Sequence, residues 1–365
     1  MSLANTLSPP NVTPESVTDA VERHRRWLRR GCWGGSLFVV FSLLAVVSYP
    51  ALIRWRLESR GWEVEYSYDS TTAPRPRWLL RFMEPFFSDS GSASFGNASL
   101  SASDVKLVAR LPNIRALTAH QATISEPTFE VLAQLGDLEL VEISGSQIDE
   151  RGLRHLGRLP KLRMILFEDT ALTSVGLSGL SECQPLTMLK LQNAKVDDDE
   201  ALSQLSKLPR LTAFMLRPSR VSDRALELLA DIQSLKQLSI HSSNLTDEGV
   251  KHLRRLPELE YLDLSGCEIT NQAVKDLAVN CPALISLWVD STEVTDAVLS
   301  DLASLPRLDE LGLYQTPISS DAVPILARFP ALSSLKMRRG SDETMASNEW
   351  DRLKLAKPKL NLFFR

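Results

Sequence analysis

The sequence predicts an α/β solenoid, with short parallel strands stacked on a concave face and short helices on the convex face. Three observations predict it: an L-x-x-L-x-L motif recurs every 24 or 25 residues, a polar helix-start signal follows each strand, and a proline ends most of the units. A unit of this length is one strand and one helix, which can bury its apolar side only against its neighbours. The 365 residues therefore favour one long array over several independent domains.

Each unit opens with a strand pattern. The unit that begins at Leu259 reads LEYLDLSGCEITN, and alternate side chains of L-x-x-L-x-L point to the same side, as they do in a strand. Together with Leu259, the starts of its nine equivalents succeed one another at steps of 24 or 25 residues, and these starts are Ile114, Leu138, Leu162, Leu186, Leu211, Leu235, Leu284, Leu308 and Leu332. We therefore predict ten units within residues 111–340.

A turn and a short helix follow each strand. A small residue stands three positions after the last core position, and its hydroxyl or thiol, where it has one, is expected to bond the turning backbone; these residues are Ala122, Ser146, Thr170, Ala194, Ser219, Ser243, Cys267, Thr292 and Thr316. The helix then starts at Ser, Thr or Asp, which are good N-cap residues. One example is Glu248–Leu256, which ends at a proline that cannot continue the helix.

Both ends of the array are expected to carry caps, because the first and last units would otherwise expose their apolar faces. We assign residues 54–110 to a connector and N-terminal cap with a degenerate repeat, and residues 341–365 to a C-terminal cap. The N-terminal cap contains an aromatic cluster that consists of Trp78, Leu79, Phe82, Phe86 and Phe87. An open alternative is that this cluster packs on a lipid bilayer.

Residues 31–53 carry no charge and are predicted to form a single transmembrane helix. As a helix they would span about 34 Å, which exceeds the bilayer core of about 30 Å. Five arginines precede this segment and three follow it, which predicts a cytoplasmic N-terminus and extracytoplasmic repeats, periplasmic or extracellular. Residues 1–30 are predicted to be a disordered basic tail. The alternative is a cleaved signal peptide, although no A-x-A-like site follows.

The repeat resembles the leucine-rich-repeat family over about Phe95 to Met337. A small residue or Cys267 at the turn, in place of Asn, is similar to the cysteine-containing and ribonuclease-inhibitor-like branches. The order of anchor, connector and repeats also resembles bacterial membrane-anchored leucine-rich-repeat proteins, through Trp62–Phe87. The resemblance implies a right-handed horseshoe that acts by binding proteins, and it implies no particular ligand.

Composition and motifs argue against other functions. The chain has 41 basic and 45 acidic residues, whereas a general nucleic-acid binder usually has a basic excess. No phosphate-loop, dinucleotide, zinc-protease or nucleophile-elbow motif occurs, so we predict neither an enzyme nor a cofactor. His120 and His241 lie five strands apart, about 24 Å, and cannot share a metal. The acidic run at 197–200 lacks EF-hand spacing and starts a helix, where negative charge is favourable.

The four cysteines are too few for a disulfide framework in a chain of this length. Cys32 borders the apolar segment, and Cys267 occupies a turn. Cys183 and Cys281 hold the same place in repeats four apart, about 19 Å, which is beyond disulfide reach.

Residues between the core positions of each strand are predicted to face the concave side, where a partner would bind. Methionine suits adaptable interfaces and aromatic side chains anchor many of them. Two groups of candidates result: Leu140, Met164, Leu166, Met188 and Met215 form one, and Tyr261, Trp288 and Tyr314 form the other. The alternative is that these side chains pack across the strands or under the chain's own flanking segments.

The sequence therefore predicts a membrane-anchored binding module whose concave face contacts an unknown protein or polymeric surface ligand, without nucleic acid or cofactor. A structural envelope scaffold that self-associates is the alternative.

Overall fold

The computed structural model describes residues 57, 60, 62–65, 91–96, 99–111, 113–194, 196, 198–217, 220–241, 243–337 and 347–364. The predicted tail, the predicted transmembrane helix at 31–53 and the aromatic cluster at 78–87 lie outside these residues. Among the residues described, none of the helices has the length and apolar character needed to cross a bilayer.

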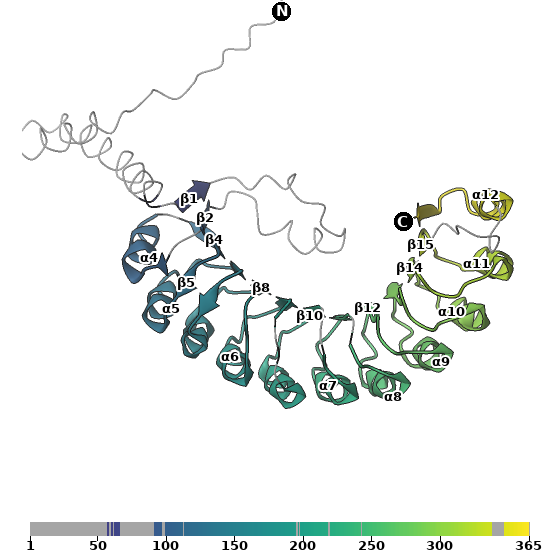
Figure 1. Cartoon of the computed structure of the whole chain (residues 1–365), viewed down its shortest axis with the longest axis horizontal. Coiled ribbons are helices and arrows are strands. Elements are labelled where there is room, and N and C mark those ends of the chain that lie inside the picture. The colour runs from purple at the N-terminus through teal and green to yellow at the C-terminus, as the bar shows by residue number, and fades with distance from the viewer. Residues whose placement is uncertain are drawn as a thin grey trace, which may run out of the picture.

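The described chain forms an arc, with one long sheet along its inner edge and helices along its outer edge (Figure 1). The repeat strands pair in parallel, as predicted, and one is present for each predicted unit. They are β4 (Ile114–His120), β6 (Leu140–Ser144), β8 (Met164–Glu168), β9 (Met188–Gln192), β10 (Ala213–Arg217), β11 (Gln237–Ile240), β12 (Tyr261–Asp263), β13 (Ser286–Trp288), β14 (Glu310–Leu313) and β15 (Ser334–Met337).

Three further strands complete this sheet. At the N-terminal end β1 (Trp62–Glu65) pairs antiparallel with β2 (Gly91–Gly96), which pairs in parallel with β4. At the other end β16 (Asn361–Phe364) pairs in parallel with β15. A second small sheet consists of β3 (Ser99–Leu100), β5 (Thr123–Ile124) and β7 (Gln147–Ile148).

The predicted helices are present on the outer edge, in part as 3-10 helices, which are labelled η. The element expected at 248–256 begins one residue earlier, as α8 (Asp247–Val250), and continues as η4 (Lys251–Arg255). The others are α4 (Ala102–Val108), α5 (Glu126–Leu132), η2 (Glu150–Arg158), α6 (Ser174–Leu180), η3 (Asp199–Lys207), α7 (Asp223–Leu229), α9 (Asn271–Asn280), η5 (Asp296–Val298), α10 (Leu299–Leu302), η6 (Ser320–Ala322), α11 (Val323–Leu326) and α12 (Ser347–Ala356).

The core is a continuous stack in which each unit places an apolar residue beside the same residue of the next unit. One such row runs through the whole array, and each of its members is fully buried: Leu117, Val141, Ile165, Leu189, Phe214, Leu238, Leu262, Leu287, Leu311 and Leu335. A constant period keeps these side chains at the strand spacing of about 4.8 Å. Apolar burial between neighbouring units therefore supplies most of the driving force for folding.

The turns after the strands behave as the sequence predicts. Ser146 and Thr170 each donate a hydrogen bond to a backbone carbonyl two residues earlier, both at 2.9 Å. Cys267 donates to the carbonyl of Ile240 in the preceding unit, at 3.4 Å. The residue that follows the strand adopts a left-handed backbone, with φ of 57° at Gly145, and its N–H donates to the next unit. The turn therefore bonds adjacent units as well as reversing the chain.

A second ladder joins the helix starts on the outer edge. The backbone N–H and hydroxyl of Thr246 donate to the Asp223 carboxylate of the preceding unit, at 2.8 and 2.7 Å. Gly249 leaves room for that carboxylate, since a Cβ there would meet Asp223 Oδ1 at 2.4 Å. Equivalent bonds from an N-cap to the preceding unit join Thr173 to Glu150, Ser222 to Asp199, Thr270 to Asp247, Thr295 to Asn271 and Ser319 to Asp296.

The ladder changes at the two units whose N-cap is an aspartate. Asp149 and Asp198 have no side-chain donor to offer, and a facing carboxylate would repel them. In the unit before Asp198, the acceptor position holds Ser174. In the unit before Asp149 it holds Glu126, which pairs with Arg154 rather than with the N-cap. At the six N-caps of the ladder, the donors of the N-cap thus match the acceptor of the preceding unit.

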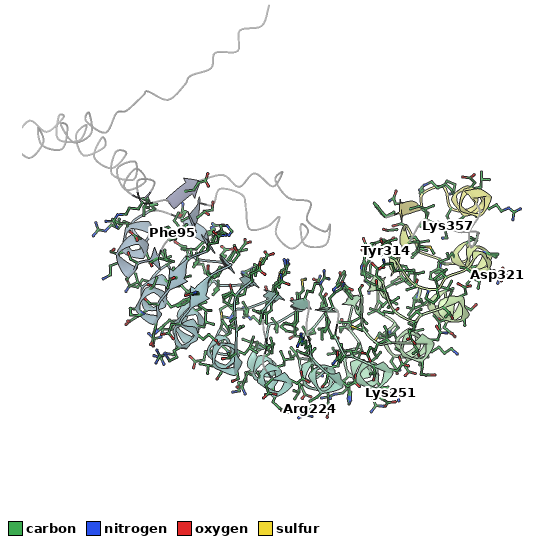
Figure 2. The ribbon with its side chains drawn as sticks, in the orientation of Figure 1. Phe95, Arg224, Lys251, Tyr314, Asp321 and Lys357 are labelled. Atoms are coloured by element: carbon green, nitrogen blue, oxygen red, sulfur yellow. The ribbon has the colours of Figure 1, made fainter. Side chains whose placement is uncertain are left out.

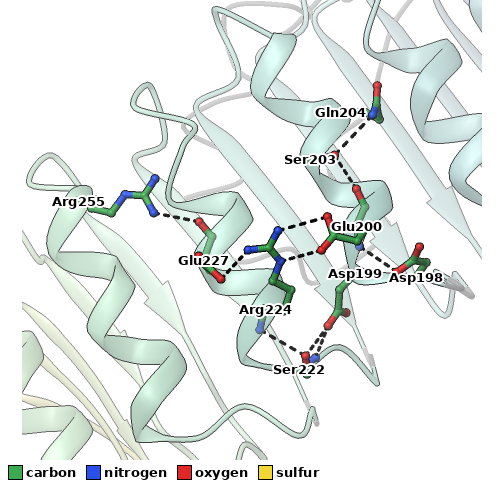
Figure 3. A network of polar contacts seen from close by, with 9 residues as sticks. All are labelled: Asp198, Asp199, Glu200, Ser203, Gln204, Ser222, Arg224, Glu227 and Arg255. Atoms are coloured by element: carbon green, nitrogen blue, oxygen red, sulfur yellow. Dashed lines mark hydrogen bonds and ion pairs between the residues drawn. The ribbon is translucent and has the colours of Figure 1, made fainter.

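The acidic run at 197–200 contributes to this ladder of polar contacts on the outer edge (Figure 3). Asp198 caps η3, Asp199 accepts from Ser222, and Glu200 pairs with Arg224, which also pairs with Glu227. The run therefore starts a helix, as predicted, and in the part of the chain that is described no three His, Cys, Asp or Glu side chains gather as a metal site.

We expect Asp223→Ala to lower the free energy of unfolding by about 1–3 kcal/mol, because it leaves the partly buried N–H and hydroxyl of Thr246 without an acceptor. Asp321→Ala is the matched control, since Asp321 is an exposed carboxylate at another helix start. Urea unfolding of both variants measures the difference. Equal stability of the two variants would contradict a structural role for the ladder.

Candidate partner-binding surface

The concave face consists of rows of side chains that run across the strands. The first row, in register, holds Ala116, Leu140, Met164, Met188, Ala213, Gln237, Tyr261, Ser286, Glu310 and Ser334. The second row, two residues further along each strand, holds Thr118, Glu142, Leu166, Lys190, Met215, Ser239, Asp263, Trp288, Gly312, Lys336 and Phe363. This register confirms the predicted concave positions.

The N-terminal half of this face is apolar and buried. Ala116, Leu140, Met164, Leu166, Met188 and Ala213 form a cluster that is separate from the main core, and we name it the apolar cluster. Met164 is 1% exposed and Met188 is fully buried. Met215 lies beside the cluster and is also buried. The structure thus brings together the first group of predicted candidates but leaves their side chains almost no surface to offer a partner, so that contact stays a prediction.

The C-terminal half of the face is polar, charged and aromatic. Arg217, on β10, forms an ion pair with Asp263 on β12 and donates from Nε to the hydroxyl oxygen of Ser239 at 2.6 Å. The other Asp263 oxygen, Oδ1, accepts from the N–H and hydroxyl of Ser265 at 3.0 and 2.6 Å. Arg217 also lies 3.4 Å from the hydroxyl of Tyr261. These bonds hold a buried carboxylate and a buried phenol in place.

A second ion pair lies nearer the C-terminus, and its lysine contacts two aromatic rings. Lys336 pairs with Asp290, whose other carboxylate oxygen accepts from the N–H of Tyr314 at 2.8 Å. The Lys336 ammonium lies 5.4 Å from the ring centre of Trp288 and 5.5 Å from that of Tyr314, within the range of a cation–π interaction. Tyr314 lies on the concave side of the arc near its C-terminal end (Figure 2). Lys336 therefore binds both rings and the carboxylate at once.

Both ion pairs bridge two strands that are not neighbours, and each passes over a small residue. Ser239 lies between Arg217 and Asp263, and Gly312 lies in the row between Trp288 and Lys336. A Cβ at Gly312 would meet Trp288 Cε3 at 2.3 Å and Asp290 Oδ1 at 2.9 Å. Glycine at this position therefore lets the indole ring lie against strand β14.

The second row ends on an exposed aromatic residue. Phe363, on the edge strand β16, stands next to Lys336 in register and is 55% exposed. Trp288 and Tyr314 are half-buried, whereas Tyr261 is buried. Trp288, Tyr314, Lys336 and Phe363 together form what we name the aromatic surface.

Two polar atoms of this half are buried without a hydrogen-bond partner among the residues described: Trp288 Nε1 and Gln237 Oε1. Burial raises the pKa of Tyr261, so its hydroxyl stays protonated at neutral pH. Burial lowers the pKa of His241, against the opposing charge of Asp263. The imidazole is therefore neutral at pH 7 and adds no positive charge to this half.

The structure divides the predicted aromatic group. Trp288 and Tyr314 meet through Lys336, while Tyr261 belongs with Arg217 and Asp263. The sequence interpretation did not single out Arg217, Asp263, Asp290 and Lys336, and it treated Phe363 only as part of the C-terminal cap. The sequence does contain a signal for these ion pairs: two opposite charges lie 46 residues apart, with a small residue on the strand between them.

The described cysteines take no part in this surface. Cys183, Cys267 and Cys281 are free thiols and are buried in the core. Burial raises the pKa of Cys183 and of Cys281 to about 12, so neither thiol ionises at neutral pH. A reactive thiolate is therefore absent from these three positions.

We expect Lys336→Met to lower the free energy of unfolding by about 1–3 kcal/mol, because it leaves Asp290 buried without its cation. The double variant Lys336→Met/Asp290→Asn should recover part of that loss, since it also removes the buried charge. Chemical unfolding of the wild type, both single variants and the double variant gives the coupling energy. Additive effects would show that the two residues do not interact.

Comparison with known proteins supports the fold. A family model described as "Leucine Rich repeat" matches residues 256–278, which is one unit of the array. No curated protein matches the sequence. Among solved structures, an internalin from Listeria monocytogenes is similar with 16% identity and a TM-score of 0.52, over 86% of this chain and 93% of that one.

A chain from the Rad7 and Elc1 complex of yeast is similar with 14% identity and a TM-score of 0.50, over 97% of this chain and 98% of that one. At these identities the two structures support the fold alone. The matched unit repeats in register along ten parallel strands of this chain. Residues 256–278 therefore match the leucine-rich-repeat family, and the fold of the described array is that of a leucine-rich-repeat solenoid.

Proposed function

We propose that this protein is a binding module that recognises a partner protein, or a polymeric surface ligand, through the aromatic surface. One observation carries the proposal: Phe363 is 55% exposed beside Lys336, in the same row as the half-buried Trp288. Exposed aromatic side chains on a rigid sheet are costly to leave in water and are typical anchors of protein interfaces.

The surroundings of these rings support recognition rather than catalysis. The ion pairs and hydrogen bonds of Asp263 and Asp290 fix the strands in place, so the rings are presented on a rigid support. The buried indole N–H of Trp288 has no acceptor among the described residues, and a partner that shifts the ring slightly and supplies a carbonyl or carboxylate would gain that bond. Rad7, which comes from a structure similar in fold, was solved in complex with the protein Elc1.

We further propose that residues 31–53 anchor the protein in a membrane, with the repeats outside the cytoplasm. The support is the uncharged length of this segment and the five-to-three distribution of arginines around it. The anchor would hold the binding face at a membrane surface. A scaffold that binds only further copies of itself is the alternative function.

The binding proposal predicts that Trp288→Ala/Phe363→Ala abolishes capture of the partner by the full-length protein. Leu355→Ala is the matched control, because Leu355 is 80% exposed but lies on α12 rather than on the aromatic surface. Affinity purification from the native cells, followed by mass spectrometry, compares the three proteins. Retention of every partner by the double variant would contradict the proposal, and recovery of this chain alone would favour the self-associating scaffold.

The topology proposal predicts that a reporter enzyme that is active only outside the cytoplasm is active when fused after Arg365. The arginine-rich flank at residues 23–30 should hold the N-terminus inside. A second fusion to a reporter that is active only in the cytoplasm is the control. An active cytoplasmic fusion would place the repeats inside the cell.

A further inference from the structure

We propose that the partner adds an extended segment of its own chain to the sheet beside β16, and that this segment carries acidic residues at one end. The inference rests on the proposed function, because Phe363 of the aromatic surface lies on β16. In the order of the sheet β16 is the last strand, at the C-terminal end of the arc (Figure 1). It pairs with β15, and its other side, which we name the open edge, has no neighbouring strand among the residues described.

The backbone of β16 offers hydrogen-bonding groups on the open edge. The N–H of Asn361 donates to the carbonyl of Ser333, just before β15, at 2.7 Å, and the two strands continue in parallel register. Because the N–H and C=O groups of successive residues point to opposite sides of a strand, those of Leu362 face the open edge. An unpaired edge of this kind is a template for a further strand.

The side chains of β16 leave this edge open to pairing. Proteins commonly block an edge strand with lysine or proline, and the sequence of β16, Asn-Leu-Phe-Phe, contains neither. The buried row that ends at Leu335 continues in register to Leu362, which is only half-buried. At the other end of the array, by contrast, Ala93 and Leu57 are fully buried. The C-terminal end therefore leaves apolar surface that an added strand would cover.

Positive charge gathers where β16 begins. From Leu353 to Phe363 the sequence has three lysines and no acidic residue. Lys354 donates to the backbone carbonyl of Leu360, Lys357 donates to a backbone carbonyl of the preceding unit at 2.5 Å, and Lys359 is exposed. A carbonyl does not carry the full charge of a carboxylate. Within the described part of the chain, these three lysines therefore form no ion pair.

This uncompensated charge indicates which occupant fits the open edge. Elsewhere in the array Lys161, Lys251 and Lys336 each pair with a carboxylate. A partner strand with acidic residues at one end would supply the missing carboxylates beside the lysines, while its apolar side chains cover Leu362 and Phe363. A second copy that paired through its own β16 would bring further lysines and no carboxylate. The charges therefore favour an acidic partner strand over self-pairing of β16.

Phage display tests the inference, with a library of random peptides and with the full-length protein in detergent as the bait. We expect the selected peptides to combine acidic residues at one end with alternating apolar residues. Their affinity, measured with synthetic peptides by fluorescence anisotropy, should fall about tenfold or more for Leu362→Pro, because proline removes the N–H that faces the open edge. An edge position of this kind tolerates proline, so the fold should persist.

Leu362→Ala is the matched control, since it shortens the same side chain but keeps the N–H, and it should bind within about threefold of the wild type. Selected peptides without acidic residues would overturn the inference. Equal affinity for the wild type and Leu362→Pro would also overturn it, as would the failure of the wild type to select any peptide.

A second measurement covers the case in which Leu362→Pro unfolds. Two versions of a selected peptide, methylated on alternate sets of backbone nitrogens, are bound to the unaltered protein. Only one set of N–H groups faces β16 in an added strand, so methylation of that set should weaken binding about tenfold or more, and methylation of the other set should have little effect. Equal effects of the two sets would overturn the inference.

Hydrogen exchange at the Leu362 amide distinguishes a partner strand from a second copy. In the free protein this amide should exchange rapidly at every protein concentration, and the selected peptide should slow its exchange about tenfold or more. Protection that increases with protein concentration in the absence of peptide would assign the open edge to a second copy and overturn the inference.

Leu362→Pro also separates this inference from the proposed function, because it leaves the side chains of Trp288 and Phe363 in place. If Leu362→Pro captures the native partner as well as the wild type does, while Trp288→Ala/Phe363→Ala does not, strand addition alone is wrong. If both variants retain every partner, the proposed function is wrong as well.

Discussion

The structure depends on one constraint: no unit of this protein can bury its apolar side except against the next unit. The row from Leu117 to Leu335 meets this constraint only because the period is held at 24 or 25 residues, so that each buried side chain finds its equivalent beside it. The polar contacts follow the same period. The turn residues bond the next unit, and the N-cap of each helix bonds the acceptor of the preceding unit.

The match between N-cap and acceptor shows how a repeat with little sequence identity between its units stays in register. Where the N-cap is Thr173, Ser222, Thr246, Thr270, Thr295 or Ser319, the preceding unit offers Asp, Glu or Asn as the acceptor. Apolar stacking is not directional, whereas these hydrogen bonds are. The ladder therefore supplies the geometric specificity that the leucine rows alone lack.

Since the core rows account for folding, the concave rows can differ from unit to unit, and they do. The N-terminal half of the face contains a buried apolar cluster. The C-terminal half contains two ion pairs and a set of partly exposed aromatic rings. The ion pairs reach over Ser239 and Gly312, so a small residue on one strand determines what its neighbours can form. In our account, recognition belongs to the half that is open.

Much of the fold was predictable from the sequence, because the period, the helix starts and the turn hydroxyls are all local signals. A strand in each of the ten predicted units, helix starts at Ser, Thr or Asp, and the bonds of Ser146 and Thr170 are confirmed. Nine of the ten strands begin two residues after the start of the predicted unit. The site was less predictable. The concave positions follow from the alternation of each strand, but the burial of Met188 depends on its neighbours in the apolar cluster, and the pairing of Lys336 with Asp290 depends on side-chain reach over Gly312.

The central claim, that the two halves of the concave face differ in access, is tested most directly by photo-cross-linking in the native cells. Benzoylphenylalanine would replace Tyr314 in one protein and His120, which is exposed on the N-terminal half, in another. The account predicts cross-linked products with a second protein from position 314 and none from position 120. Products from position 120, with or without products from position 314, would contradict it.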